Sequence, residues 1–274
     1  MRSFASRFAR QRAGVAAALF VLLLIGIAIV MPLAGLGDAD RISNDVLIAP
    51  SQAHLLGTDD LGRDVLVDLL RGVQVSLFVG FTAAAAASVL GIVIGATSGH
   101  YGGLADLAVM RLAEIFQVIP SFILAAVLVA LSGPGLMRVV TVIALLAWPQ
   151  VARVTRGEVL RVTHLDYVDA VRCLGYRESY ILFAEVIPNA IAPALAVSTL
   201  IVGQAILLEA SLAFFGLSSV DIVSWGRMLN SGQRFLFNAW WLSFFPGVAI
   251  FCTVLAFNLL GDAIGATLDP KGKR

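Results

Sequence analysis

Long runs of apolar residues constrain this chain more strongly than any other feature of its sequence. The first extends from about Ala13 to Leu36 and contains no charged residue. Because an α-helix needs about 20 apolar residues to cross the hydrocarbon core of a bilayer, this run is long enough to span it. Hydrophobic residues make up 59% of the 274 residues, charged residues only 14%, and the mean hydropathy is +0.92. Such a chain is too apolar for a soluble protein of this length, which predicts an all-α membrane protein with several spans.

The basic N-terminus indicates how the first span is oriented. Arginines at positions 2, 7, 10 and 12 precede the apolar run. The alternative is a cleaved signal peptide, which has the same basic start but an apolar core of only about 7–15 residues. The longer run predicts a retained signal anchor whose N-terminus lies in the cytoplasm.

Further apolar segments complete a prediction of six transmembrane helices. Their approximate bounds are 73–99, 105–131, 136–154, 189–212 and 242–265. In the first of these segments Gly91, Gly95 and Gly99 recur at every fourth residue, a spacing that lets another helix approach closely. We therefore expect this span in the interior of the bundle. In the segment 136–154, Pro149 removes one backbone hydrogen bond and is expected to kink the helix.

The basic residues support a cytoplasmic location for both termini. Cytoplasmic loops of membrane proteins carry an excess of Lys and Arg. Of the 19 lysines and arginines, only a minority would lie outside, namely Arg41, Arg63, Arg71, Arg138, Arg227 and Arg234. The predicted units are then residues 1–72 (the N-terminus, first span and outer loop), 73–265 (a five-helix core with a cytoplasmic loop at about 153–188) and 266–274 (a cytoplasmic tail).

The first outer loop is acidic and contains the segment H-L-L-G-T-D-D-L-G-R-D-V-L, residues 54–66. Its glycines and aspartates predict a turn that leads into a helix capped near Asp59 or Asp60. A calcium loop is the alternative, but the spacing lacks the terminal Glu of an EF-hand. Asp59, Asp60, Arg63 and Asp64 are expected either to contact a partner outside the membrane or to lock the loop onto the bundle.

A polar island at residues 166–189 interrupts the apolar chain. Its first part predicts a short helix with Tyr167, Ala170, Val171 and Leu174 along one side, ended by Gly175, which readily adopts a left-handed conformation. A second helix at about 177–186 is expected to stop before Pro188. Such short helices are unstable alone, so the apolar side should be buried against the bundle or against another protein.

The motif of this island resembles the EAA loop of ABC-importer permeases. The matching residues are Asp169, Ala170, Val171, Leu174 and Gly175, followed by Ile187, Pro188 and Asn189. In that family the loop forms a coupling helix that docks on a cytoplasmic ATPase, which implies coupling roles for Tyr167, Asp169, Ala170, Val171, Leu174, Gly175 and Pro188. Asp169 stands where the family usually has Glu, and Val171 where it usually has Ala; both changes keep the charged or apolar character.

Other segments extend the resemblance from the outer loop to the tail. They are residues 54–66, V-S-L at 75–77, E-A-S-L-A-F-F-G-L at 209–217, S-W-G-R-M-L at 224–229 and G-D-A-I-G-A-T-L-D-P at 261–270. Together they are similar to the C-type permease subunit of dipeptide, oligopeptide and nickel importers. The resemblance implies the transmembrane-domain fold of a type I ABC importer in the bacterial cytoplasmic (inner) membrane.

The resemblance also implies partners and a class of substrate. A homologous B-type subunit would supply the other half of the pore, two ATPase subunits or one fused ATPase would bind ATP and Mg inside, and a binding protein would deliver substrate outside. The expected substrates are di- or oligopeptides, with nickel chelates or other small solutes as alternatives.

The remaining polar candidates lie in the fifth predicted span. Gln204 and Glu209 are expected to contact the pore or a partner, or else a neighbouring helix and the lipid headgroups respectively. No phosphate loop, catalytic triad or metal-ligand spacing is present, so neither catalysis nor a cofactor in this chain is expected, and the balanced charge gives no basis for nucleic-acid binding. Rival classes are a self-sufficient secondary carrier and an intramembrane hydrolase.

Overall fold

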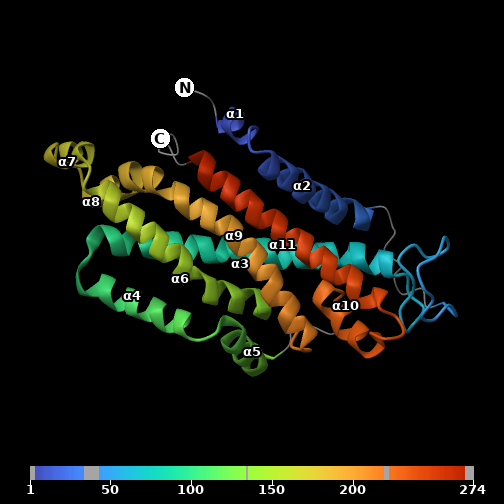
Figure 1. The fold of residues 1–274 in the computed structure, drawn as a ribbon. Coiled ribbons are helices and arrows are strands. Elements are labelled where there is room, and N and C mark those ends of the chain that lie inside the picture. Colours follow the sequence, from blue (N-terminus) through green and yellow to red (C-terminus); the bar gives the residue numbers. More distant parts are fainter. Residues whose placement is uncertain (1–3, 34–42, 134, 219–221, 269–274) are drawn as a thin grey trace.

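The computed structural model describes residues 4–33, 43–133, 135–218 and 222–268, and this part of the chain is helical with no strand beyond one isolated bridge between Thr58 and Asp64. Its long helices form an elongated bundle (Figure 1). The elements in chain order are α1 (Phe4–Phe8), α2 (Arg12–Leu33), α3 (Val65–Tyr101), α4 (Gly103–Val118), α5 (Ser121–Ser132), α6 (Leu136–Thr163), α7 (Asp166–Cys173), α8 (Glu178–Tyr180), the π-helical η1 (Ile181–Val186), α9 (Ile187–Phe214), α10 (Trp225–Gly232), the 3-10 helix η2 (Gln233–Phe235) and α11 (Trp241–Leu268).

The bundle has two distinct ends. Short α7, the start of α1 and the final turns of α11 lie at one end, which we call the α7 end, whereas α10 and the loop of residues 43–64 lie at the other, the α10 end (Figure 1). Among the described residues, five helices are long and apolar enough to cross a membrane, and the number is six if the bent pair of α4 and α5 counts as one span. The predicted multi-pass all-α architecture is therefore confirmed.

The segment predicted as one continuous helix at 105–131 is not continuous in the structure. It breaks between α4 and α5, whose axes differ by 94°. Ile119 has an extended backbone with φ −80° and ψ 131°, as expected for a residue before proline, and Pro120 has no N–H with which to continue the helix. The prediction overlooked the effect of Pro120.

Three other helices extend beyond the predicted bounds. α3 begins at Val65 instead of near residue 73, and α6 continues through Pro149 to Thr163. The helix after α7 does not stop before Pro188, because α8, η1 and α9 form one apolar helical stretch, Glu178–Phe214. The wide π turn of η1 ends at Val186, two residues before Pro188. A proline, which has no donor N–H, is tolerated there because it lies near the start of an α-helical segment.

The closest helix contact in the core is between α3 and α6. A Cβ atom added at Gly91 would lie 2.5 Å from Cβ of Val151, one at Gly95 would overlap the backbone of Ala152, and one at Gly99 would lie 2.9 Å from the carbonyl oxygen of Arg156. The glycine row therefore fulfils its predicted role of bringing another helix close. Buried residues of α2, α9, α10 and α11 complete the core around α3.

An ion pair fixes α4 against α6 near the α7 end. Arg156 donates from Nε to Asp106 Oδ1 and from Nη2 to Oδ2, each at 2.6 Å, and Ser98 of α3 donates to the same carboxylate. A bidentate, partly buried pair of this kind is stronger and more specific in geometry than a single exposed one. Asp106 therefore links α4 to both α3 and α6, whereas the glycine row brings together only α3 and α6.

A bulky residue in the glycine row should disrupt this packing. Replacing Gly95 with Leu should lower the free energy of unfolding of the bundle by about 1–3 kcal/mol, because α6 must shift to admit the side chain. The matched control is Gly26→Leu in α2, since no atom lies within 4 Å of a Cβ built at Gly26. Melting temperatures of the two detergent-purified variants measure the difference, and equal temperatures would contradict the assigned role of the row.

Candidate functional site

α7 is a two-turn helix whose ends follow from its sequence. Asp166 and Asp169 lie in its first turn and Arg172 in its last, which places charges favourably with respect to the helix dipole. Gly175 follows with φ +83°, the left-handed conformation that ends many helices. The predicted helix and its glycine stop are thus present in the structure.

The contact of α7 with its own bundle is made by a residue that the sequence analysis did not single out. Val168 is fully buried in a cluster with Val159 and Val162 of α6 and Ile181 and Leu182 of η1. Its partner one turn later is the partly buried Val171. The spacing of Val168 and Val171, three residues apart, predicts that the two side chains share one face of the helix. Most of the residues singled out from the sequence lie on the neighbouring face.

The rest of the predicted apolar side faces away from the bundle. Leu174 is 75% exposed, and Tyr167 and Ala170 are also exposed. Further exposed apolar side chains follow in the next segment, namely Tyr176, Tyr180 and Phe183, with the rings of Tyr176 and Tyr180 stacked at 4.8 Å. We call Tyr167, Ala170, Leu174, Tyr176, Tyr180 and Phe183 the α7 surface. An exposed apolar patch beside a short, charged helix such as α7 indicates a surface for interaction.

A chain of charged groups connects α7 to α3. Arg172 donates from Nη1 to Asp169 Oδ1 at 2.7 Å and from Nε to Glu178 Oε1 at 2.9 Å. The other oxygen of Glu178 lies 2.9 Å from Nε2 of His100, a side chain only 1% exposed at the end of α3. Asp169 and α7 are therefore held in a defined position relative to α3 and to the start of the helical stretch that becomes α9.

Midway along the bundle, α5, α6 and α9 line an open cavity of about 420 Å³, the central cavity, which combines amides with apolar side chains. Gln204 of α9 and Gln150 of α6 both line it and both are exposed. Ser121 at the start of α5 and Ser211 add hydroxyl groups, and Phe122, Ile143 and Leu146 are among its apolar residues. Gln204 thus faces a cavity and not only a neighbouring helix, and Gln150 is a second amide that the sequence analysis missed.

Glu209 occupies a different environment from that expected. The residue is 0% exposed, and among the described residues neither carboxylate oxygen has a hydrogen-bond partner. α10 covers this part of α9, since a Cβ atom at Gly226 would overlap the backbone of Ala210. In this conformation the carboxyl is enclosed by its own chain, so contact with a pore, a partner or lipid headgroups would require α10 to move.

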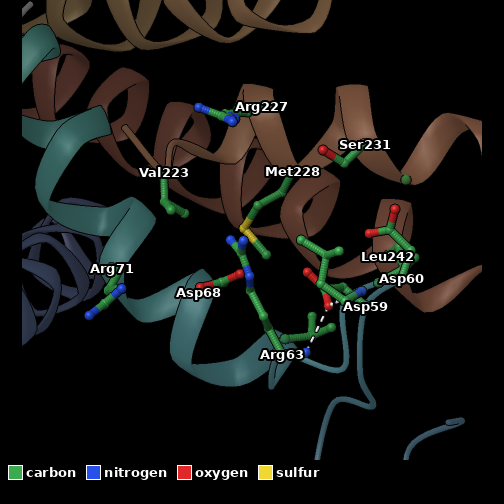
Figure 2. Close-up of a pocket in the computed structure, with 13 residues that line it drawn as sticks. Asp59, Asp60, Arg63, Asp68, Arg71, Val223, Arg227, Met228, Ser231 and Leu242 are labelled. Carbon is green, nitrogen blue, oxygen red and sulfur yellow. Dashed lines mark hydrogen bonds between the residues drawn. The ribbon is translucent and has the colours of Figure 1, made fainter. Parts of the chain in front are cut away.

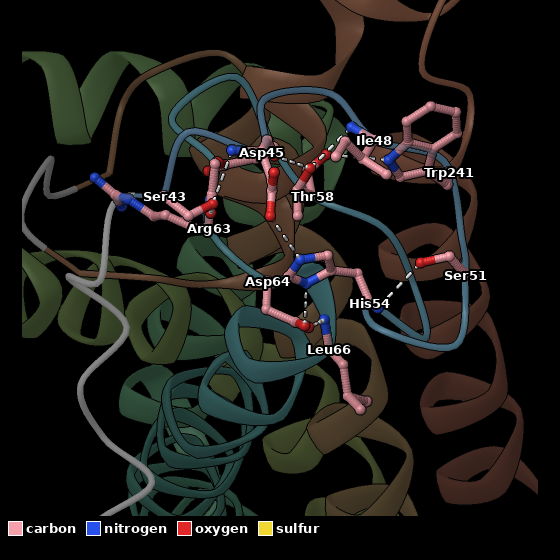
Figure 3. Close-up of polar contacts among 12 residues, drawn as sticks. Ser43, Asp45, Ile48, Ser51, His54, Thr58, Arg63, Asp64, Leu66 and Trp241 are labelled. Carbon is pink, nitrogen blue, oxygen red and sulfur yellow. Dashed lines mark hydrogen bonds and ion pairs between the residues drawn. The ribbon is translucent and has the colours of Figure 1, made fainter.

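At the α10 end, the loop of residues 43–64 is locked by polar contacts around Thr58 and His54 (Figure 3). Thr58 Oγ1 donates to the carbonyl oxygen of Asp45 and accepts from the N–H of Ile48 at 2.9 Å. Trp241 Nε1 donates to the carbonyl oxygen of Thr58 at 3.2 Å, which attaches the loop to α11.

The helix cap in this loop is Asp64, not Asp59 or Asp60 as predicted. Asp64 Oδ1 accepts from the N–H of Leu66 at 2.9 Å. Asp59 stabilises the preceding turn instead, because its Oδ1 accepts from the N–H groups of Leu61 and Arg63. The loop reverses at Gly62, with φ +73°, before the helix begins, so the earlier aspartates lie too far upstream to cap it. Asp60 is exposed.

His54 joins two carboxylates of the loop. Its Nδ1 lies 3.0 Å from Asp64 Oδ2, and its Nε2 lies 3.6 Å from Asp45 Oδ2. The hydrogen bond to Asp64, followed by that to Asp45, raises the pKa of His54 above its usual value of 6.5 despite partial desolvation. Among the described residues, no group of three or more His, Cys, Asp or Glu side chains is arranged to hold a metal ion.

Comparison with known proteins identifies the family of the chain. Residues 87–274 match the family described as the binding-protein-dependent transport system inner membrane component. The chain belongs to this family. The fold is accordingly the membrane domain of a type I ABC importer, and the protein is a permease subunit that functions with ATPase and binding-protein partners.

Relatives of the permease match over nearly its whole length. It is 38% identical to a glutathione transport system permease protein of Pectobacterium atrosepticum, over 99% of this chain and 91% of the relative. It is 36% identical to a di/tripeptide transport system permease protein of Pseudomonas aeruginosa, over 100% and 93%. An oligopeptide transport system permease protein of Bacillus subtilis is 35% identical, over 97% and 88%.

The raised pKa of His54 predicts that the loop of residues 43–64 loosens at alkaline pH. Because its pKa is raised on folding, His54 contributes stability that is fully present below about pH 6.5 and is lost as the pH rises through the raised pKa. Hydrogen exchange of residues 54–64, corrected for the intrinsic pH dependence of exchange, should show protection that falls over this window. In His54→Gln the protection should be independent of pH, and an identical pH profile in both proteins would refute the assignment.

Proposed function

We propose that this permease forms half of the translocation pore of an ATP-driven importer of di- and oligopeptides. The exposed α7 surface is the single observation that carries the proposal, since it offers an apolar docking site at one end of a bundle that is otherwise built for lipid. The relatives named for di/tripeptide and oligopeptide transport support peptides as substrates.

The α7 end is proposed to face the cytoplasm of a bacterial cell, across the cytoplasmic membrane. The basic residues of the N-terminus, of α6 and of the island support this orientation by the positive-inside rule. A homologous permease would complete the pore, and two ATPase subunits, or one fused ATPase, would bind against the α7 surface. A binding protein would then deliver substrate at the α10 end.

The contacts of α7 provide a route for mechanical coupling. Glu178 begins the helical stretch that reaches Phe214, so α7, held to Glu178 through Arg172, is attached to the start of the helix that carries Gln204. His100 links the same carboxylate to α3. A displacement of α7 by the ATPase would therefore move α3 and α9 together and alter the walls of the central cavity.

In this proposal the central cavity is part of the peptide pathway. The amides of Gln150 and Gln204 both donate and accept hydrogen bonds, which suits the backbone of a peptide, and the apolar residues tolerate varied side chains. ATP and Mg²⁺ would bind only to the partner subunits, because the sequence contains no phosphate loop. The chain would contribute no catalytic group.

Coupling can be tested by changes at one residue of the α7 surface and at two positions that shape and hold α7. In the reconstituted importer, Leu174→Asp, Gly175→Val and Asp169→Lys should each reduce ATPase stimulation by the loaded binding protein about tenfold or more. The aspartate removes apolar contact, valine is strained at φ +83°, and lysine repels Arg172. The melting temperature of Leu174→Asp should stay unchanged, because the side chain does not pack on its own bundle.

The charge-matched control is Asp262→Lys, an exposed position in the final turns of α11. It should leave stimulation unchanged. Stimulation at the normal level in all three α7 variants would refute the coupling assignment. Transport of peptide by the purified chain alone, without an ATPase, would refute the subunit proposal itself.

The central cavity makes a separate prediction. Gln150→Leu and Gln204→Leu should each reduce peptide uptake about fivefold, since a net hydrogen bond contributes about 1 kcal/mol. Leu207→Met, an apolar replacement in the lining of the same cavity, should have no effect. Uptake rates in proteoliposomes provide the measurement, and normal uptake in both glutamine variants would exclude the cavity from the pathway.

A further inference from the structure

A second cavity lies at the α10 end and shares no lining residue with the central cavity (Figure 2). Its volume is about 480 Å³, and it lies between the turn before α3, the first turns of α3, α10 and the start of α11. This volume falls in the range of sites for small ligands. In the proposed orientation it is on the side from which substrate arrives.

The cavity is lined by equal numbers of acidic and basic side chains. They are Asp59, Asp60, Arg63, Asp68, Arg71 and Arg227. Ser231 adds a hydroxyl group, and Met228, Val223 and Leu242 provide apolar wall. In the described part of the chain no three carboxylate or imidazole groups are placed to hold a metal ion, so the carboxylates do not indicate a cation site. The mixture of both charges instead suits a ligand that carries both.

Asp68 is a buried carboxylate with an oxygen that forms no hydrogen bond within the described residues. Only 8% of the residue is exposed, yet among the described residues its Oδ1 accepts no hydrogen bond. Nε of Arg63, which lines the same cavity, is also buried and unpartnered there. Unpaired buried polar atoms are costly and uncommon, and the two here have opposite charge.

We propose that this cavity is an entry site for the zwitterionic form of a short peptide, with the peptide ammonium at Asp68 and the carboxylate at Arg63. An ammonium group supplies three donors and a carboxylate accepts from a guanidinium, so each unpartnered atom gains a charge-assisted bond. Treated as a cube, the cavity is about 8 Å across, and two residues of extended chain span about 7 Å. A dipeptide with free ends therefore matches both its charges and its size. This inference rests on the proposed peptide import.

Binding can be measured directly on the complete importer in nanodiscs without the binding protein, with radiolabelled Ala-Ala as the probe. Wild type should bind it saturably. Asp68→Asn and Arg63→Gln should each weaken binding about tenfold or more, whereas Asp262→Asn should bind as wild type does. N-acetylated Ala-Ala amide should not compete, and free alanine should compete weakly, because it fills less of the cavity than a dipeptide does.

Three results would overturn the inference: no saturable binding to wild type, wild-type affinity in Asp68→Asn, or competition by the blocked peptide equal to that of Ala-Ala. Equal melting temperatures of Asp68→Asn and wild type would show that the variant is folded. If Asp68→Asn instead weakened only the docking of the peptide-free binding protein, the cavity would receive a side chain of that protein and the peptide assignment would be wrong.

The same nanodiscs separate this inference from the proposed function. When the binding protein, ATP and peptide are supplied, stimulated ATPase activity tests the importer assignment independently. Normal stimulation without binding of Ala-Ala would overturn the entry site alone. Loss of stimulation in wild type would overturn the importer assignment.

Discussion

The approach of α3 to α6 through Gly91, Gly95 and Gly99 is the contact on which the rest of the bundle depends. Helices in lipid gain little from the hydrophobic effect on association, so they rely on close backbone packing and on polar contacts. The glycine row supplies the first, and the pair of Asp106 and Arg156 supplies the second at its α7 end. With α6 fixed, its C-terminal turns present Val159 and Val162 to α7, and its middle presents Gln150 to the central cavity.

Helix positions were predictable from the sequence because lipid imposes one simple requirement, that each span be long and apolar. Breaks within the spans were harder to predict, as Pro120 and Pro188 illustrate. Both prolines lack a donor N–H, yet the chain bends by 94° at Pro120 and continues as a helix through Pro188. The difference lies in the preceding turn, which is extended at Ile119 and π-helical in η1, and neither conformation is evident from the local composition.

The candidate site was predictable in outline but not in its contacts. The helix of the island and its end at Gly175 followed from local rules, whereas the burial of Val168 depends on residues of α6 and η1 that are distant in sequence. The same holds for His100 and Glu178, which are separated in sequence by α4, α5, α6 and α7 and meet only in the folded chain. Asp64, the true cap of α3, was one of several aspartates in a short turn, and only the reversal at Gly62 distinguishes it.

The break between α4 and α5 exposes backbone groups that need a polar partner. The last carbonyls of α4 and the first N–H groups of α5 have no partner within their helices, and Ser121 and Phe122 at this break line the same cavity as the two glutamines. Irregular backbone is tolerated at membrane depth only where protein or water covers it. This polar wall must therefore be covered by protein or water, a role that the proposed second permease subunit would fill.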